Sequence, residues 1–281
     1  LYVVELPISN SVSKIGKSYR DDMQSSFPNI RHMRVFVEMA RTGSVSTAAE
    51  LCHLSQPAAT QAIASLEANF GTALLIRNRQ RSTLTACGTL VERRTRAALK
   101  HLRDGAKNAL REAGNKAAHR QTFELSVTAS QLRNLIAIAN AGSFTVAART
   151  LGLSQPTVHR TARNLEAVAG MPFFTPRPSG VRLTAAADAF MRGAKLAQSE
   201  LRQAVEDISR ETGEESGTFV LGSLPLARTA IVPKAIHAMV STVEGFQVRV
   251  VEGRYAELLR SLREGDIDCL IGALRQPIPA D

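Results

Sequence analysis

The chain has few of the residues, and none of the motifs, on which catalysis and metal binding usually depend. Its three cysteines, Cys52, Cys87 and Cys269, have no metal-binding spacing, and its six histidines form no cluster with them. No Gly-x-Gly-x-x-Gly, phosphate-binding loop or Gly-x-Ser-x-Gly motif occurs, and no acid/base pair stands out. We therefore expect neither an enzyme nor a metal site nor a cofactor. The cysteines are interpreted as small buried thiols in a reducing compartment.

Long apolar runs are also missing. The longest are a few residues, far short of the roughly 20 that a helix needs to cross a bilayer. Residues 1–28 are polar and lack the apolar core of a secretory signal, so residues 1–29 are predicted to be an N-terminal tail. This tail is either natural or an extension wrongly placed before Met23. We expect no membrane partner and a cytoplasmic location.

Positive charge is concentrated in one stretch. The net charge is +10, and residues 77–120 hold 12 Lys and Arg against three acidic residues. Such a block suits a polyanion such as DNA, because each neutralised phosphate releases a counterion. A solvated basic helix is the alternative that charge alone leaves open.

A sequence repeat determines the expected architecture. Residues 43–86 align without a gap to residues 142–185, and 15 of the 44 positions are identical at an offset of 99. Two copies are too few for a solenoid, so the repeat indicates a duplicated small domain.

Each copy contains the pattern of three helices followed by a hairpin. Met33, Phe36, Val37 and Ala40 share one helical face, as do Leu132, Leu135, Ile136 and Ala139. A Gly-Ser turn and paired alanines follow. Ser55-Gln56-Pro57 and Ser154-Gln155-Pro156 then predict the start of a third helix, because serine caps a helix and proline is tolerated in its first turn. That third helix has an exposed polar beginning suited to the major groove, and a two-stranded wing follows it.

These residues resemble the LysR-type transcriptional regulators. The resemblance lies in Ala48-Ala49, the Ser-Gln-Pro turns, Leu66-Glu67 and the Leu-Thr of each wing, over residues 30–112 and again 129–212. It implies double-stranded DNA as partner and a nucleoid-associated location in a bacterial cytosol. The implied DNA-binding residues are Ser55, Gln56, Pro57, Thr60, Gln61, Arg77, Arg79, Arg81, Ser154, Gln155, Thr157, His159, Arg160, Arg163 and Arg182. The family normally has one such domain, so the duplication is a departure.

The two copies differ at the positions where the family places basic residues. The first copy has Thr60, Gln61 and Ala64 on its third helix, and the second has His159, Arg160 and Arg163. In the wing the first copy keeps Arg77, Arg79 and Arg81, whereas Pro176 replaces Arg77 in the second. Our hypothesis is that the second copy reads bases and the first binds the backbone. The alternative is that one copy has become a structural spacer.

A long helix with a coiled-coil seam follows each wing. Phe190, Ala194, Ala197, Leu201, Ala204 and Ile208 repeat at a period of 3.5, and Val91, Thr95, Ala98, Leu102, Gly105 and Ala109 form a weaker seam in the same register. The family dimerises through this helix, so we expect a homodimer or higher oligomer. The two helices could instead pair within one chain. The stronger second seam favours pairing between chains.

The C-terminal residues predict alternating strands and helices. Phe219–Gly222, Phe246–Val251 and Asp268–Gly272 are predicted strands, separated by helices at 228–242 and 254–265, which implies a parallel sheet. This resembles the first half of the family's periplasmic-binding-protein-like effector domain. Ser223 and Leu224 would then contact a small organic effector at a strand end, although Ser223 could equally be a capping residue. Either the sequence is a fragment or the product is truncated.

The predicted fold is therefore mainly α with an α/β C-terminal part. It comprises a tail (1–29), two tandem winged helix-turn-helix domains (30–88 and 126–185), linker helices (89–125 and 186–216) and a partial βαβαβ effector subdomain (217–281). The predicted function is sequence-specific transcriptional regulation of the LysR type. A truncated module that forms heterodimers with full-length regulators is the alternative.

Overall fold

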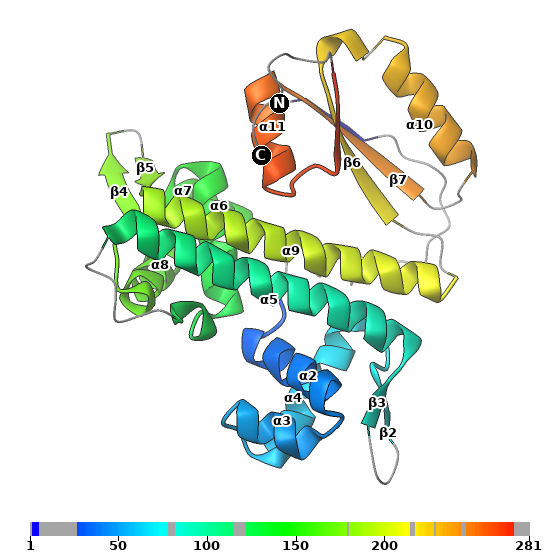
Figure 1. Ribbon diagram of the computed structural model, residues 1–281. Coiled ribbons are helices and arrows are strands. Elements are labelled where there is room, and N and C mark those ends of the chain that lie inside the picture. The colour runs from blue at the N-terminus through cyan, green and yellow to red at the C-terminus, as the bar shows by residue number, and fades with distance from the viewer. Residues whose placement is uncertain are drawn as a thin grey trace. The chain divides into compact units, whose positions relative to one another are not determined.

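The computed structural model describes residues 2–5, 27–77, 82–114, 122–178, 180–213, 217–227, 229–242 and 246–272. The chain is mainly helical with some sheet, and it divides into two compact units (Figure 1). The larger unit spans residues 14–207, and the smaller comprises residues 1–13 and 208–281.

The chain contains two copies of one series of elements, which we call the first repeat (residues 30–113) and the second repeat (residues 129–211). The elements of the first repeat are α2 (Ile30–Thr42), α3 (Val45–Leu51), α4 (Gln56–Phe70), β2 (Leu75–Arg77), β3 (Ser82–Leu84) and α5 (Ala86–Ala113). Those of the second are α6 (Ala129–Ala141), α7 (Phe144–Leu151), α8 (Gln155–Ala169), β4 (Phe174–Arg177), β5 (Gly180–Leu183) and α9 (Ala185–Glu211). A short 3₁₀ helix, η2 (Phe123–Leu125), precedes the second repeat.

Local sequence explains why the helices start and stop at equivalent places. A side-chain oxygen caps the start of each of the first three helices in both repeats, with Asn29, Ser44, Ser55, Thr128, Ser143 and Ser154 as the capping residues. Each such cap stabilises a helix by about 1 kcal/mol. The first and third helices of both repeats end at a glycine in the left-handed region, where a side chain would be strained.

The apolar face of the first helix differs slightly from the predicted one. Met33 and Phe36 are fully buried as predicted, but the next buried residue on α2 is Met39, whereas Val37 and Ala40 are half-buried. The buried residues of α2 are Ile30, Met33, Val35, Phe36 and Met39, because α3, α4 and α5 all pack against this helix. On α6, Ile138 is buried and Ala139 is half-buried for the same reason.

The long helices α5 and α9 pack against each other within the chain (Figure 1). All twelve predicted seam residues are buried. Arg94 of α5 contacts Glu200 and Asp207 of α9, whereas Gly105 of α5 contacts Gly193, so the two helices run antiparallel. The structure has the pairing within one chain that the sequence left as the alternative. Close approach at Gly105 and Gly193 compensates for the small residues of α5.

The smaller unit is a sheet with a helix on each face. Its elements are β1 (Tyr2–Glu5), β6 (Gly217–Ser223), η3 (Pro225–Ala227), α10 (Ile231–Thr242), β7 (Phe246–Glu252), α11 (Tyr255–Arg263) and β8 (Cys269–Ile271). The strand order is β1-β7-β6-β8, and β6 is parallel to both β7 and β8, which confirms the predicted parallel sheet. Alternate strand residues face opposite ways: Leu221 packs in a cluster with Val232 of α10, and Val220 in a cluster with Leu258 of α11.

Strand β1 was not predicted from the sequence. It pairs antiparallel with β7, so that Val3 lies opposite Val251 at the edge of the sheet. Residues 2–5 are therefore not part of a simple tail. Four residues with little alternation carry too weak a signal for a strand, and their partner strand lies about 250 residues away in the sequence.

Candidate nucleic-acid interface

The start of α4 presents a polar face to solvent. Ser55, Gln56, Pro57, Thr60 and Gln61 are all exposed. The opposite face of the helix, with Ala59, Ile63 and Leu66, is buried. The Ser55 hydroxyl accepts a hydrogen bond from the backbone N–H of Ala58 at 3.4 Å, which fixes the first turn. The structure therefore brings these five predicted residues together on one accessible helix end.

The start of α8 presents an equivalent face with different chemistry. Ser154, Gln155, His159, Arg160 and Arg163 are exposed and Thr157 is half-buried. The Ser154 hydroxyl accepts from the Thr157 N–H at 3.4 Å. On α8, His159, Arg160 and Arg163 present an imidazole ring and two guanidinium groups. The equivalent residues of α4, Thr60, Gln61 and Ala64, present a hydroxyl, an amide and a methyl group.

The basic side chains of α8 are held to different degrees. The ring of His159 lies 5.1 Å from the ring of Phe144, centroid to centroid, so packing orients it. Arg163 donates to Glu166 at 2.7 Å, although about half of its side chain is exposed. Arg160 has no ion-pair partner in the described part of the chain. Of the three, Arg160 is thus the one whose donors are most available to a ligand.

A carboxylate on the third helix holds the hairpin in both repeats. In the first, Glu67 Oε1 accepts from the backbone N–H groups of Leu74 and Leu75, at 2.9 and 3.2 Å. In the second, Glu166 Oε1 accepts from Phe173 and Phe174, at 2.7 and 3.1 Å. Charge-assisted bonds of this kind are stronger than neutral ones. The Leu-Glu pair was noticed in the sequence as part of a resemblance, but this structural role was not found there.

A threonine closes each hairpin on the next helix. Thr85 Oγ1 donates to the carbonyl of Ala73 at 2.8 Å and accepts from the Gly88 N–H, so it also caps α5. Thr184 makes the equivalent bonds to Pro172 and Ala187. The identical glutamates and threonines at these places therefore have an architectural role in both repeats, whereas the exposed faces of α4 and α8 differ.

The predicted arginines of the hairpins are only partly described. Arg77 ends β2 opposite Ser82, and Arg79 and Arg81 lie outside the described residues. In the second hairpin Arg182 is exposed on β5 opposite Thr175, and Arg177 is exposed at the end of β4.

The predicted effector residues lie at the end of β6. Ser223 is buried, and its hydroxyl donates to the carbonyl of Leu224 at 3.2 Å. The N–H of Leu224 donates to the carbonyl of Ile271 on β8 at 3.0 Å, and the short η3 follows. Both residues are therefore at the carboxyl ends of parallel strands, as predicted.

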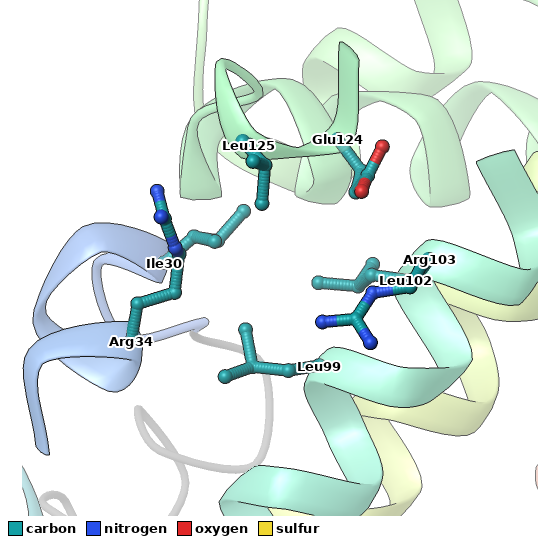
Figure 2. Close-up of a pocket in the computed structure, with 7 residues that line it drawn as sticks. All are labelled: Ile30, Arg34, Leu99, Leu102, Arg103, Glu124 and Leu125. Carbon is teal, nitrogen blue, oxygen red and sulfur yellow. The ribbon is translucent and has the colours of Figure 1, made fainter. Parts of the chain in front are cut away.

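A small cavity lies between α2, α5 and η2 in the larger unit (Figure 2). It is lined by Ile30, Arg34, Leu99, Leu102, Arg103, Glu124 and Leu125, and its volume is about 30 Å³. This is room for a water molecule and not for an organic effector. Burial raises the pKa of the Glu124 carboxyl, and Arg103 and Arg34 offset this only in part.

Within the described residues no helix is long and apolar enough to span a membrane. No group of three or more His, Cys, Asp or Glu in that part of the chain could hold a metal ion. Cys52 and Cys87 are free and buried, which confirms the prediction for these two thiols, whereas Cys269 is half-buried.

A capped helix-turn-helix followed by a hairpin defines a class of DNA-binding protein. Residues 30–89 and 129–188 each match the family described as bacterial regulatory helix-turn-helix protein, lysR family. The HTH-type transcriptional regulator GalR of Pseudomonas putida is 34% identical over 250 residues, which cover 88% of this chain and 61% of GalR. The HTH-type transcriptional regulator PcaQ of Agrobacterium fabrum is 34% identical over 146 residues, which cover 52% of this chain and 47% of PcaQ.

Both helix-turn-helix segments of the chain therefore match the LysR family, and the curated relatives that it resembles are named as transcriptional regulators. The chain spans less than two thirds of the length of these curated relatives. Among solved structures, the complex of the CbnR DNA-binding domain with DNA is 37% identical and covers 30% of this chain and 95% of that one, with a TM-score of 0.27.

Proposed function

We propose that the chain is a sequence-specific, DNA-binding transcriptional regulator of the LysR type, acting in the bacterial cytoplasm on double-stranded DNA. Its two repeats would be tandem winged helix-turn-helix domains, at residues 30–88 and 126–185, joined to their linker helices. The observation that carries the proposal is the pair of polar helix ends on α4 and α8, exposed and capped in the same way. No observation favours the alternative of a truncated module that forms heterodimers with full-length regulators.

The second repeat would contribute most of the base readout. Gln155, Thr157, His159 and Arg160 lie within the first two turns of α8, the part of a recognition helix that reaches base edges. An arginine can bond a guanine in two places, which is worth about 1–3 kcal/mol of discrimination. Arg163 would contribute less, because part of its donor capacity is used by Glu166.

The first repeat would contribute mainly backbone affinity through its hairpin arginines, Arg77, Arg79 and Arg81. The contribution of α5 is smaller than its sequence charge indicates. Arg96 is paired with Glu92, and Lys100 with Asp104, so these cations are partly neutralised within the helix. Phosphate contacts by this repeat would therefore come more from the hairpin than from the helix.

The smaller unit would be part of an effector-binding domain. Ser223 and Leu224 stand at the carboxyl ends of parallel strands, where open α/β sheets usually bind ligands. A small organic effector is the expected ligand class. Residues 217–281 would form the first βαβαβ subdomain of that site.

Binding of the purified chain to genomic DNA fragments, measured by gel shift at several salt concentrations, tests the function. Retention of particular fragments at raised salt is expected. Arg160→Ala should weaken binding to the preferred fragment by about 1–3 kcal/mol and relax the sequence preference of the chain. Arg182→Ala should weaken binding to all fragments alike. It should also lower the slope of the logarithm of the binding constant against the logarithm of salt concentration by about one.

Arg192→Ala is the matched control for both substitutions. This arginine is exposed on the linker helix α9, where it pairs with Asp188 four residues away, and no DNA contact is predicted for it. Binding that is lost uniformly as salt rises, with no fragment preferred, would contradict the proposed function. Equal and sequence-independent losses from Arg160→Ala and Arg182→Ala would contradict the assignment of base readout to α8.

A further inference from the structure

The helices α5 and α9 are equivalent by the repeat, but the contacts at the two ends of their pair are different. At one end Gly105 and Gly193 face each other, and a Cβ built on Gly105 would lie 3.0 Å from the Cα of Gly193. At the other end Arg94 donates to Asp207 at 2.8 Å and to Glu200 at 3.1 Å. The pair is therefore close-packed at one end and ionic at the other.

The ionic end is largely shielded from water. The side chain of Arg94 is 23% exposed, that of Glu200 21% and that of Asp207 7%. Burial lowers the pKa of the Arg94 guanidinium, but the bonds to Asp207 and Glu200 more than offset this, so the pKa is raised. Removing one partner of such a cluster leaves charge without compensation, which is more costly than losing a surface pair.

Two copies of α9 could not reproduce this arrangement. In a two-fold pair the same residues must serve on both sides. The repeat offset of 99 places Gly193 where α5 has Arg94, so Glu200 and Asp207 of each helix would face a glycine. Arg192 would remain at the position of Arg93, but Arg93 is 64% exposed and such a pair contributes little.

Two copies of α5 would fail for a steric reason as well. Arg94 would then stand where Gly193 stands, and a Cβ at that place lies 2.6 Å from the carbonyl oxygen of His101. Backbone atoms cannot give way as a flexible side chain can. The positions of the two carboxylates on α9 would be taken by His101 and Asn108, with Asp104 one turn away between them.

The antiparallel pairing also sets the places of the two hairpins. The first hairpin ends where α5 begins, and the second ends where α9 begins. Because the helices run in opposite directions, the hairpins lie at opposite ends of the pair, as Figure 1 shows. Each end therefore has its own third helix, and the two polar faces carry different residues.

We infer that one chain forms a complete two-site DNA-binding unit, and that it binds, as a single chain, a duplex whose two half-sites are unlike. The inference rests on the proposed function. The ionic and close-packed contacts favour pairing of α5 with α9 over pairing of either helix with the same helix of a second chain. The unlike faces of α4 and α8 then give the operator a direction instead of a two-fold axis.

Selection of binding sequences from a randomised duplex library, using the full chain, tests the operator. The expected product has two different half-sites, whose centres are about one helical turn or a multiple of it apart. Arg160→Ala should lower the preference roughly tenfold at one half-site and leave the other unchanged. Gln61→Ala should act on the other half-site.

A palindromic product, or equal relaxation of both half-sites by Arg160→Ala, would overturn the inference while the proposed function stood. Absence of any enriched sequence would overturn both. Light scattering of the chain bound to the selected duplex supplies the stoichiometry. One chain per pair of half-sites is expected, and two chains with each bound to one half would contradict it.

The helix pair is tested separately without DNA. Arg94→Glu should destabilise the larger unit, and reversal of charge on the other side, with Glu200→Arg and Asp207→Arg, should restore part of the loss. Arg93→Glu is the matched control, since it touches the same Asp207 from an exposed position. A large effect of Arg93→Glu with none from Arg94→Glu would contradict the assigned pairing, whatever the DNA experiments show.

Discussion

Gly193 is the residue at which the close packing of α5 and α9 can be tested by the addition of one methyl group. A Cβ at Gly193 would lie 2.6 Å from the carbonyl oxygen of His101 and 2.9 Å from the Cα of Gly105. Both are backbone atoms, so the helices themselves would have to separate. A Cβ at Gly105 is less crowded, with its nearest neighbours at 3.0 and 3.3 Å.

The two substitutions share one gain and differ in one cost. Replacing a helical glycine by alanine stabilises the helix by about 1 kcal/mol. Overpacking a filled interface costs about 1–3 kcal/mol. Gly193→Ala, whose Cβ is the more crowded, should therefore destabilise the larger unit by up to about 2 kcal/mol, whereas Gly105→Ala should be close to neutral. For a unit of this size each kcal/mol corresponds to about 2–4 °C in melting temperature.

Urea and thermal unfolding followed by the helical circular dichroism signal measure this difference. Arg192→Ala, next to Gly193 but exposed, controls for the general effect of alanine on α9 and should change stability by less than about 0.5 kcal/mol. Equal effects of Gly193→Ala and Gly105→Ala, or a gain in stability from Gly193→Ala, would show that the helices are not packed as closely as described.

Three further substitutions test buried polar groups. Glu124→Gln should stabilise the chain near neutral pH by about 1 kcal/mol, because one carboxylate oxygen is buried without a partner. Its raised pKa means that the native protein binds the proton more tightly than the unfolded chain, so stability is highest below the ordinary value of 4.5 and falls as pH rises through the raised pKa. The advantage of the glutamine should therefore vanish in unfolding curves taken below pH 4.5; an advantage that is constant with pH would contradict this. Thr95→Val should stabilise the α5–α9 seam by about 1 kcal/mol in urea unfolding, since the Thr95 hydroxyl is fully buried and unpaired; a loss would mean that the hydroxyl has a partner. Asn134→Ala should destabilise by about 1–2 kcal/mol, because the amide donates to the Val158 carbonyl at 2.8 Å, and the loss should exceed that of a Ser130→Ala control on the same helix.

The sequence predicted the local elements well because each repeat carries its own start and stop signals. These signals are the serine caps, the left-handed glycines and the Ser-Gln-Pro turns. Each acts over a few residues, so it can be recognised without knowledge of the rest of the fold. The exposed faces of α4 and α8 followed from the same patterns. The seam residues on α5 and α9 were also correct, because a period of 3.5 survives even where the residues are small.

The sequence could not show which helix pairs with which. That choice depends on the gap between Gly105 and Gly193 and on the three-dimensional meeting of Arg94 with two carboxylates more than 100 residues away. Hydrophobic strength, the available sequence measure, favoured pairing between chains and gave no sign of these contacts within the chain. The role of the Glu166 carboxylate could not be predicted for a similar reason. It accepts hydrogen bonds from backbone N–H groups, which every sequence has.

Pairing of α5 with α9 within one polypeptide changes how the helix pair responds to dilution. In a dimer of separate chains the fraction assembled falls with protomer concentration, because association has a translational entropy cost. Here the connecting polypeptide supplies the partner helix at a fixed effective concentration. The fraction of chains with the helix pair formed is therefore the same at very low and at high protein concentration. The concentration of the protein then affects only how often the protein encounters DNA.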